Sequence, residues 1–211
     1  LIQLLLARGA NPNVQTKLRI PLRNAVQDRQ SDLMLTTGTT PLLRAAKAAD
    51  MQAMRALLDA GADANLANDI GYTPLLAAAG AGRGNSPTRN GQKTEDMAIE
   101  AVRMLLAAGA DVNARGADSD TALMGAAYRG WTKLAEVLAG AGAALDAGDK
   151  DGMTAIDYAM GRYRPRFLEN KAVPYPQTAE ALRKLGATKE TKDPPKWPGL
   201  GVPQITADVP K

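Results

Sequence analysis

The chain has 211 residues, 45% of them hydrophobic, and a net charge of only +4, with one Phe, two Trp and five Tyr. The absence of cysteine and histidine excludes disulfides, zinc sites built from those residues, cysteine nucleophiles and histidine general bases. So small a charge favours neither strong nucleic-acid binding nor a polybasic membrane patch, and no apolar run approaches the roughly 18 residues of a membrane-spanning helix.

The N-terminal segment, 1–17, is predicted to be the second half of a helical repeat. Leu1 lies inside an amphipathic helix, which is followed by the turn sequence Gly9-Ala10-Asn11-Pro12-Asn13. We therefore expect an incomplete repeat here, with any earlier repeat or signal peptide lying upstream. Residues 18–35 are predicted to be an insertion before the next repeat.

Two sets of similar phrases alternate along the rest of the chain. The first set is Gly38-Thr39-Thr40-Pro41-Leu42, Gly71-Tyr72-Thr73-Pro74-Leu75, Ser119-Asp120-Thr121-Ala122-Leu123 and Gly152-Met153-Thr154-Ala155-Ile156. The second set resembles the turn that begins at Gly9: Gly61-Ala62-Asp63-Ala64-Asn65, Gly109-Ala110-Asp111-Val112-Asn113 and Gly142-Ala143-Ala144-Leu145-Asp146. The step from Thr40 to Thr73 equals the step from Thr121 to Thr154. A repeat of about 33 residues with insertions accounts for both sets.

Each repeat is predicted to contain a turn and two short helices. Thr40 and Thr73 are placed as N-caps, and Pro41 and Pro74 take the first helical position, where no N–H group is needed. Gly61 and its equivalents follow an apolar helix and suit the left-handed conformation that ends it. Helices this short are marginal alone, so the repeats must stack on one another.

The period, the Thr-Pro-Leu start and the Gly-Ala-Asp-x-Asn end resemble the ankyrin repeat family over about residues 1–187. The resemblance implies an all-α fold, an ankyrin-repeat solenoid of stacked helix-turn-helix units with short turn or finger loops. The insertions are similar to those of a group of bacterial ankyrin proteins. Leu43, Leu76, Met124 and Asp157 replace the histidine of the family motif. We expect apolar packing to substitute at the first three, with somewhat looser turns.

The domain boundaries follow from this alignment of repeats. The array is predicted to contain the partial repeat 1–17, the insertion 18–35, and the repeats 36–68, 69–116 with an insertion at 82–96, 117–149, and 150–187 with an insertion at 162–175. Residues 188–211 are rich in proline and lysine and cannot continue the stack. We expect a tail that acts as a linker, the alternative being a short strap that packs on the final repeat.

Several sequences that could indicate chemistry have simpler explanations. The glycines of 80–84 follow no strand, so a loop is favoured over a phosphate cradle. The Gly-Ala-Asp-x-Asn turns lack the dense oxygen ligands of calcium loops. The acidic pairs Asp118 with Asp120 and Asp149 with Asp151 fall in turns, where Asp bonds its own backbone. We therefore expect no catalytic residue, no metal and no cofactor.

The family resemblance implies that a partner protein contacts the fingers and the exposed face of each first helix, a concave strip across several repeats. The residues carried over onto this strip are Arg44, Lys47, Tyr72, Tyr128, Arg129, Trp131, Lys150 and Met153. Aromatic and arginine side chains dominate interface energies, so Tyr72, Tyr128, Arg129 and Trp131 are expected to contribute most. Trp131 has an equally good structural explanation, covering the start of its second helix.

The sequence thus predicts a monomeric, non-catalytic interaction module or scaffold that binds a protein of unknown identity. Two alternatives remain open. One is a regulatory or targeting domain of a larger enzyme. The other is a weak nucleic-acid binder through the basic loop 162–167, which contains Arg162, Arg164 and Arg166. A soluble chain is expected, either cytoplasmic or exported.

Overall fold

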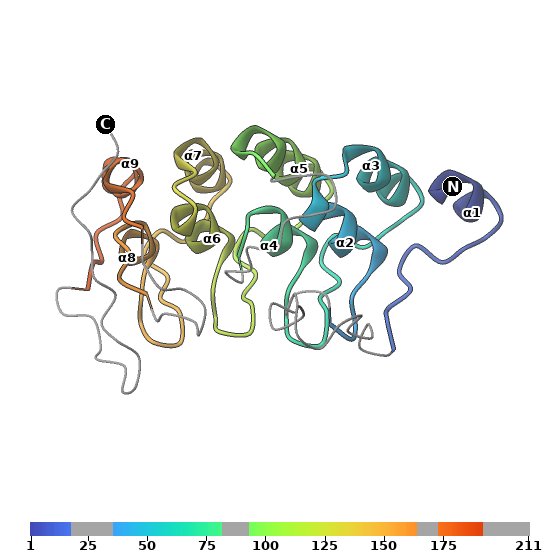
Figure 1. Cartoon of the computed structure of the whole chain (residues 1–211), viewed down its shortest axis with the longest axis horizontal. Helices are drawn as coiled ribbons and strands as arrows, with labels where there is room; N and C mark the ends of the chain where they lie inside the picture. Colours follow the sequence, from blue (N-terminus) through green and yellow to red (C-terminus); the bar gives the residue numbers. More distant parts are fainter. Residues whose placement is uncertain (18–35, 82–92, 164–172, 192–211) are drawn as a thin grey trace, which may run out of the picture.

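Figure 1 shows the computed structural model as two rows of short helices, with α1 at one end and α9 at the other. The structure describes residues 1–17, 36–81, 93–163 and 173–191. Within these ranges it contains helices and turns and no strand. The predicted all-α solenoid of helix-turn-helix units is confirmed.

The inner row contains the first helix of each repeat, and the outer row contains the second. The inner helices are α2 (Pro41–Ala48), α4 (Pro74–Ala78), α6 (Ala122–Tyr128) and α8 (Ala155–Ala159). The outer helices are α1 (Ile2–Ala7), α3 (Met51–Asp59), α5 (Glu95–Ala107), α7 (Thr132–Gly140) and α9 (Pro176–Lys184). Each helix packs on the next one in its own row, and the segments that lead to the next inner helix extend to the same side of the stack (Figure 1).

The helix ends form where the sequence predicts them. The hydroxyl of Thr40 accepts a hydrogen bond from the backbone N–H of Leu43 at 3.1 Å, and Thr73 and Thr121 cap α4 and α6 in the same way. Gly61 has a φ of +84°, the left-handed conformation that ends an outer helix without steric cost only when no Cβ is present. The predicted caps and stops are confirmed.

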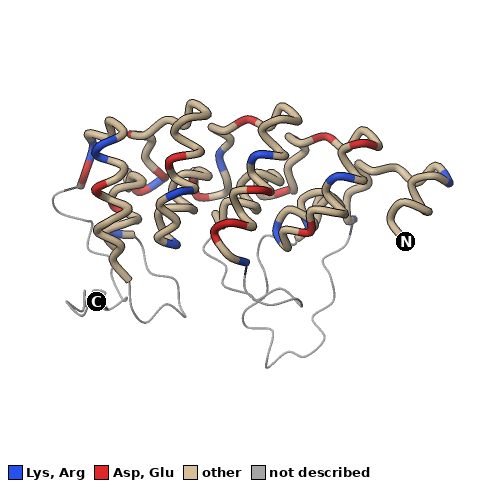
Figure 2. Tube along the Cα trace, turned by 90° about the horizontal axis from the view of Figure 1, so that it is seen from above, with Lys and Arg blue, Asp and Glu red and all other residues tan. Residues whose placement is uncertain are grey.

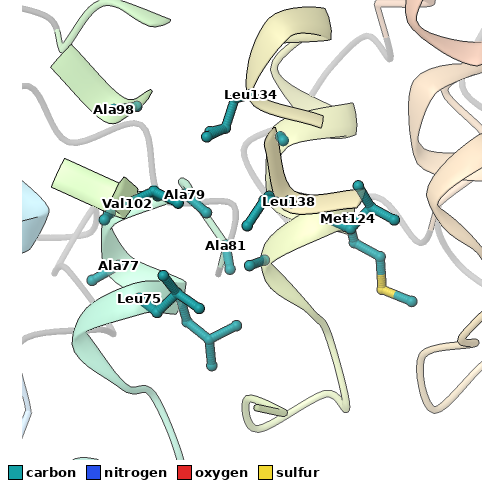
Figure 3. Close-up of a cluster of buried hydrophobic side chains, with 14 of the residues drawn as sticks. Leu75, Ala77, Ala79, Ala81, Ala98, Val102, Met124, Leu134 and Leu138 are labelled. Carbon is teal, nitrogen blue, oxygen red and sulfur yellow. The ribbon is translucent and has the colours of Figure 1, made fainter. Parts of the chain in front are cut away.

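The core is a continuous layer between the two rows, built from Ala, Leu and Met. Figure 3 shows its section between α4, α5, α6 and α7, which contribute Leu75, Val102, Met124 and Leu138 in turn to the core. Small alanines between these larger side chains allow the helices to approach closely. Stacking therefore gives each short helix the burial that it could not obtain alone.

The replaced histidine of the family motif is compensated in two ways. Leu43, Leu76 and Met124 are at most 1% exposed, which confirms that apolar packing substitutes there. Asp157 is fully buried, and its carboxylate accepts hydrogen bonds from the backbone N–H groups of Thr154 and Thr191, both at 2.9 Å. In the last repeat a charged side chain thus joins the start of α8 to the C-terminal segment.

A ladder of side-chain hydrogen bonds links the repeats along the outer row. The side chain of Asn13 accepts from the N–H of Asp63 at 2.8 Å and donates to the carbonyl of Gly61 at 3.1 Å. Asn65 and Asn113 repeat both contacts with the following turn. The final step is Asp146, whose carboxylate accepts from the backbone N–H groups of Thr188 and Lys189.

Residues 188–191 accordingly pack against the last repeat instead of leaving it. Glu190 takes the position that Asn occupies in the earlier ladder steps, but it pairs with Arg162 and Arg183, both at 2.7 Å. These contacts close the end of the stack. The rest of the predicted tail, 192–211, lies outside the described residues, as does the insertion 18–35.

Candidate protein-interaction site

Inner helices end and outer helices begin along one edge of the stack, which we call the turn edge. Lys47 lies in the last turn of α2, Arg129 is the C-cap of α6, and Trp131 is the N-cap of α7. Lys93 lies just before Thr94, the N-cap of α5. We call Lys47, Lys93, Arg129 and Trp131, which come from three successive repeats, the turn-edge cluster.

The two cations of the cluster nearest to Trp131 both contact its ring. The ammonium of Lys93 lies 5.8 Å from the ring centroid, and the guanidinium carbon of Arg129 lies 5.1 Å from it. These distances are typical of cation–π contacts. Lys93 also donates to the carbonyl oxygens of Ala77 and Ala78 at 2.9 and 2.6 Å, at the carboxyl end of α4. Trp131 is half-buried and packs against the core, so it covers the start of α7 and exposes part of its ring.

Glycines make room for the side chains of this edge. A Cβ on Gly80 would lie 2.7 Å from Cδ of Arg129, so the arginine rests directly against the turn that follows α4. A Cβ on Gly130 would lie 2.6 Å from Cγ of Tyr175, the N-cap of α9. Gly130 also has a positive φ of 67°, which favours glycine. The turns between the two helices of the repeats 69–116, 117–149 and 150–187 therefore lie against one another.

The basic groups of the cluster are partly desolvated and repel one another. Burial, with a smaller contribution from the charge of Arg129, lowers the pKa of Lys47 to about 8. Burial followed by the charges of Arg129 and Lys47 lowers the pKa of Lys93 to about 7. Burial also lowers the pKa of Arg129. Glu95 is close to Lys93 in sequence, but its carboxylate accepts a hydrogen bond from the backbone N–H of Leu134 in α7.

Aromatic rings continue from the cluster into the fourth repeat. Tyr128 is half-buried and meets Tyr163 edge to face, with ring centroids 5.0 Å apart. Tyr163 in turn stacks on Tyr158 at 5.5 Å, and the hydroxyl of Tyr158 donates to Asp149 at 2.8 Å. Tyr128 is therefore held in place by packing, with part of its surface accessible.

Two of the residues expected to contact a partner are structural. Tyr72 and Met153 are each 2% exposed, so the prediction that they present side chains to a partner is wrong. The ring of Tyr72 lies against Gly116, and its hydroxyl donates to the carboxylate of Asp120 at 3.2 Å. The residue before the capping threonine is buried in all four repeats.

The other expected residues lie apart from the cluster. Lys150 is exposed and pairs with Asp118 at 2.5 Å in the neighbouring finger. Arg44 is exposed on α2, where it lines an apolar groove between α1 and α2. Arg162 pairs with Glu190 and donates to the carbonyl of Thr191, and its expected role in an accessory basic loop stays a prediction.

The remaining basic-loop residues, Arg164 and Arg166, lie outside the described residues. Sequence reasoning missed Lys93 and Tyr175. Both lie within the predicted insertions 82–96 and 162–175, where no periodic pattern indicates which way a side chain points. Only the stacking of the repeats brings these residues to the turn edge.

Among the residues that the structure describes, no three His, Cys, Asp or Glu side chains are placed to hold a metal ion. None of the helices in the described ranges is long and apolar enough to cross a membrane.

Paired helices, capped turns and a shared core define a repeat solenoid, a class of protein that presents an extended surface for recognition. The chain belongs to the ankyrin repeat family. It matches the family model for ankyrin repeats in three copies over residues 93–169 and the model for ankyrin repeats in many copies over residues 42–86, together more than half of the sequence. No curated protein sequence matches it. Ankyrin repeats generally mediate protein–protein interactions and are typically non-catalytic.

Proposed function

We propose that this chain is a non-catalytic interaction module or scaffold that binds a partner protein at the turn-edge cluster. The supporting observation is that Lys93 and Arg129 both contact the ring of the half-buried Trp131, with Lys47 at the end of the preceding inner helix α2. Binding energy concentrates where aromatic and arginine side chains lie in a rigid, partly desolvated setting. The helix ends fix these side chains before a partner arrives, which reduces the entropy cost of association.

The concave strip extends this surface. Arg44 and Lys150 are exposed on the inner helix α2 and on a finger, and they are proposed as peripheral contacts. Exposed charges at the rim of an interface change association rates more than affinity. The same surface would serve a regulatory or targeting domain of a larger enzyme. The contacts of Arg162 with Glu190 and Thr191 give no support to a nucleic-acid site at 162–167.

The test is photo-cross-linking in a lysate of the source cells. A p-benzoylphenylalanine residue replaces Lys133, which is exposed on α7 close to Trp131. The control carries the same group in place of Gln52, which is exposed on the outer helix α3. We expect a protein cross-link at position 133 that is lost in a Trp131→Ala background and is absent at position 52. A product at position 52 alone, or none at either position, would contradict the proposal.

A further inference from the structure

The first outer helix, α1, exposes two side chains whose equivalents are buried in every later repeat. The glycines that end the outer helices, from Gly9 to Gly186, fix which residues correspond. Ile2 and Leu5 are 38% and 51% exposed. Their equivalents are at most 3% exposed: Met54 and Leu57, Val102 and Leu105, Ala135 and Leu138, Ala179 and Leu182. Ile2 and Leu5 therefore occupy core positions that no described residue covers completely.

The later outer helices are covered by the inner helix of their own repeat. In Figure 1, α3, α5, α7 and α9 lie beside α2, α4, α6 and α8 respectively, and each pair is in contact. α1 packs on α3, and no inner helix precedes it in the part of the chain that the structure describes. The vacant side of α1 borders an apolar groove of about 410 Å³, lined by side chains of α1, α2 and α3. A single short helix is the element that takes this place in every later repeat.

The groove carries little charge. Figure 2 shows the N-terminal end of the stack almost entirely in tan, because residues 1–17 contain two charged residues, Arg8 and Lys17, and neither lines the groove. The charged residues of the lining are Arg44 and Asp50. The carboxylate of Asp50 caps α3, whereas Arg44 is exposed at the rim of the groove. An apolar ligand with one complementary charge suits this surface.

Arg44 lies at the position where a later inner helix meets the one before it. Its equivalents in the following repeats are Ala77, Gly125 and Tyr158, which are all buried and uncharged. A Cβ on Gly125 would lie 2.8 Å from Cα of Ala81, in the turn that follows α4. By this equivalence, Arg44 meets the carboxyl end of a helix in the groove, where unpaired carbonyl groups carry partial negative charge. Because the repeats of this chain place no charge at the contact, Arg44 favours a separate protein over one more ordinary repeat.

We propose that the groove between α1 and α2 binds an amphipathic helix of a partner protein, with leucine-sized side chains against Ile2 and Leu5 and an acidic residue in its last turn beside Arg44. A helix bound in a groove docks by its apolar face. The buried residues of α2 give the expected pattern of that face: Leu42, Leu43, Ala45 and Ala46. No residue of the turn-edge cluster lines the groove, so this is a second site that goes beyond the proposed function.

The experiment measures the fluorescence anisotropy of fluorescein-labelled peptides as the full chain is added. The basic peptide has the sequence of residues 39–50, which contains the pattern of α2. The acidic peptide is the same sequence with Lys47→Glu, which places a carboxylate in the last turn of the helix. We expect the parent chain to bind the acidic peptide at least about threefold more tightly than the basic one, since exposed charge pairs are weak. Leu42→Ser with Leu43→Ser in the acidic peptide should abolish binding.

Variants of the chain separate the apolar contact from the charge. Ile2→Gln with Leu5→Gln should weaken binding of the acidic peptide at least about tenfold, which corresponds to about 1.4 kcal/mol. The control variant, Met97→Gln with Leu185→Gln, replaces two exposed apolar side chains outside the groove and should stay within about twofold of the parent. Arg44→Glu changes an exposed residue and should reverse the preference, so that the basic peptide binds more tightly.

Three results would overturn the inference: no binding of the acidic peptide by the parent, equal weakening in the control variant, or an unchanged preference in Arg44→Glu. Two further measurements identify other occupants. A dimer of the parent in sedimentation velocity that dissociates in Ile2→Gln with Leu5→Gln would assign the groove to a second copy. A longer form of the chain, with residues before Leu1, that fails to bind the acidic peptide would assign the groove to a preceding segment. Either result would contradict a partner helix.

Discussion

Gly125, in the middle of α6, lies where the backbones of two repeats approach closely. A Cβ at this position would lie 2.8 Å from Cα of Ala81 and 2.9 Å from the carbonyl carbon of Gly80. In an ordinary helix, Gly→Ala stabilises by about 1 kcal/mol. Here the opposing atoms belong to the main chain and cannot rotate away, so overpacking should cost about 3 kcal/mol. We predict that Gly125→Ala lowers the free energy of unfolding by about 2 kcal/mol, the difference between these terms.

Urea denaturation followed by circular dichroism measures this change. Gly140 provides a matched control, because it is an exposed helical residue in the same repeat, and no atom lies within 4 Å of the position that a Cβ would take there. Gly140→Ala should therefore stabilise the chain by roughly 0.5–1 kcal/mol. A Gly125→Ala chain as stable as the parent would refute the reasoning about the close approach of the repeats.

Further predictions concern the core, a buried hydroxyl and the dependence of stability on pH. Leu105→Ala, at a fully buried position of α5, should cost about 2–5 kcal/mol in urea unfolding, and a loss below about 1 kcal/mol would argue against the shared core. Tyr72→Phe should cost about 1–3 kcal/mol, because it leaves the buried carboxylate of Asp120 without that donor; an unchanged unfolding midpoint would contradict this role. The pKa of Lys93 falls from 10.5 to about 7 on folding, so between these pH values the unfolded chain binds more protons than the folded chain. The free energy of unfolding should therefore rise with pH from about 7 toward 10. Urea unfolding at several pH values should give a smaller rise in Lys93→Gln, where Lys47 still contributes; equal slopes in both chains would contradict the assignment.

The repeated elements could be predicted from the sequence because their signals are local. Thr40 and Thr73 cap the helices that follow them, and Gly61 ends an outer helix, since each requires only its neighbours in the chain. The burial of Leu43 and Leu76 follows from the same period. Local chemistry that recurs once in every repeat therefore specifies the array.

The site could be predicted only in part, because contacts between repeats decide exposure. The resemblance places Tyr72 at a finger position that contacts partners. Its hydroxyl instead donates to Asp120 in the next repeat, and the Tyr72 side chain is buried. Lys93 falls within the predicted insertion 82–96 and has no periodic position, and its ammonium donates to carbonyl groups at the end of α4. The buried carboxylate of Asp157 likewise finds partners in the C-terminal segment.

The most direct test of the central claim is nuclear magnetic resonance of the nitrogen-labelled chain during titration with the protein that cross-links at position 133. The claim is that recognition is centred on the turn edge. It predicts that the largest shift changes occur at the indole N–H of Trp131 and at the backbone amides of Arg129 and Gly130. Changes concentrated at Gly38, Gly71 and the other fingers, with the Trp131 indole unmoved, would contradict the account.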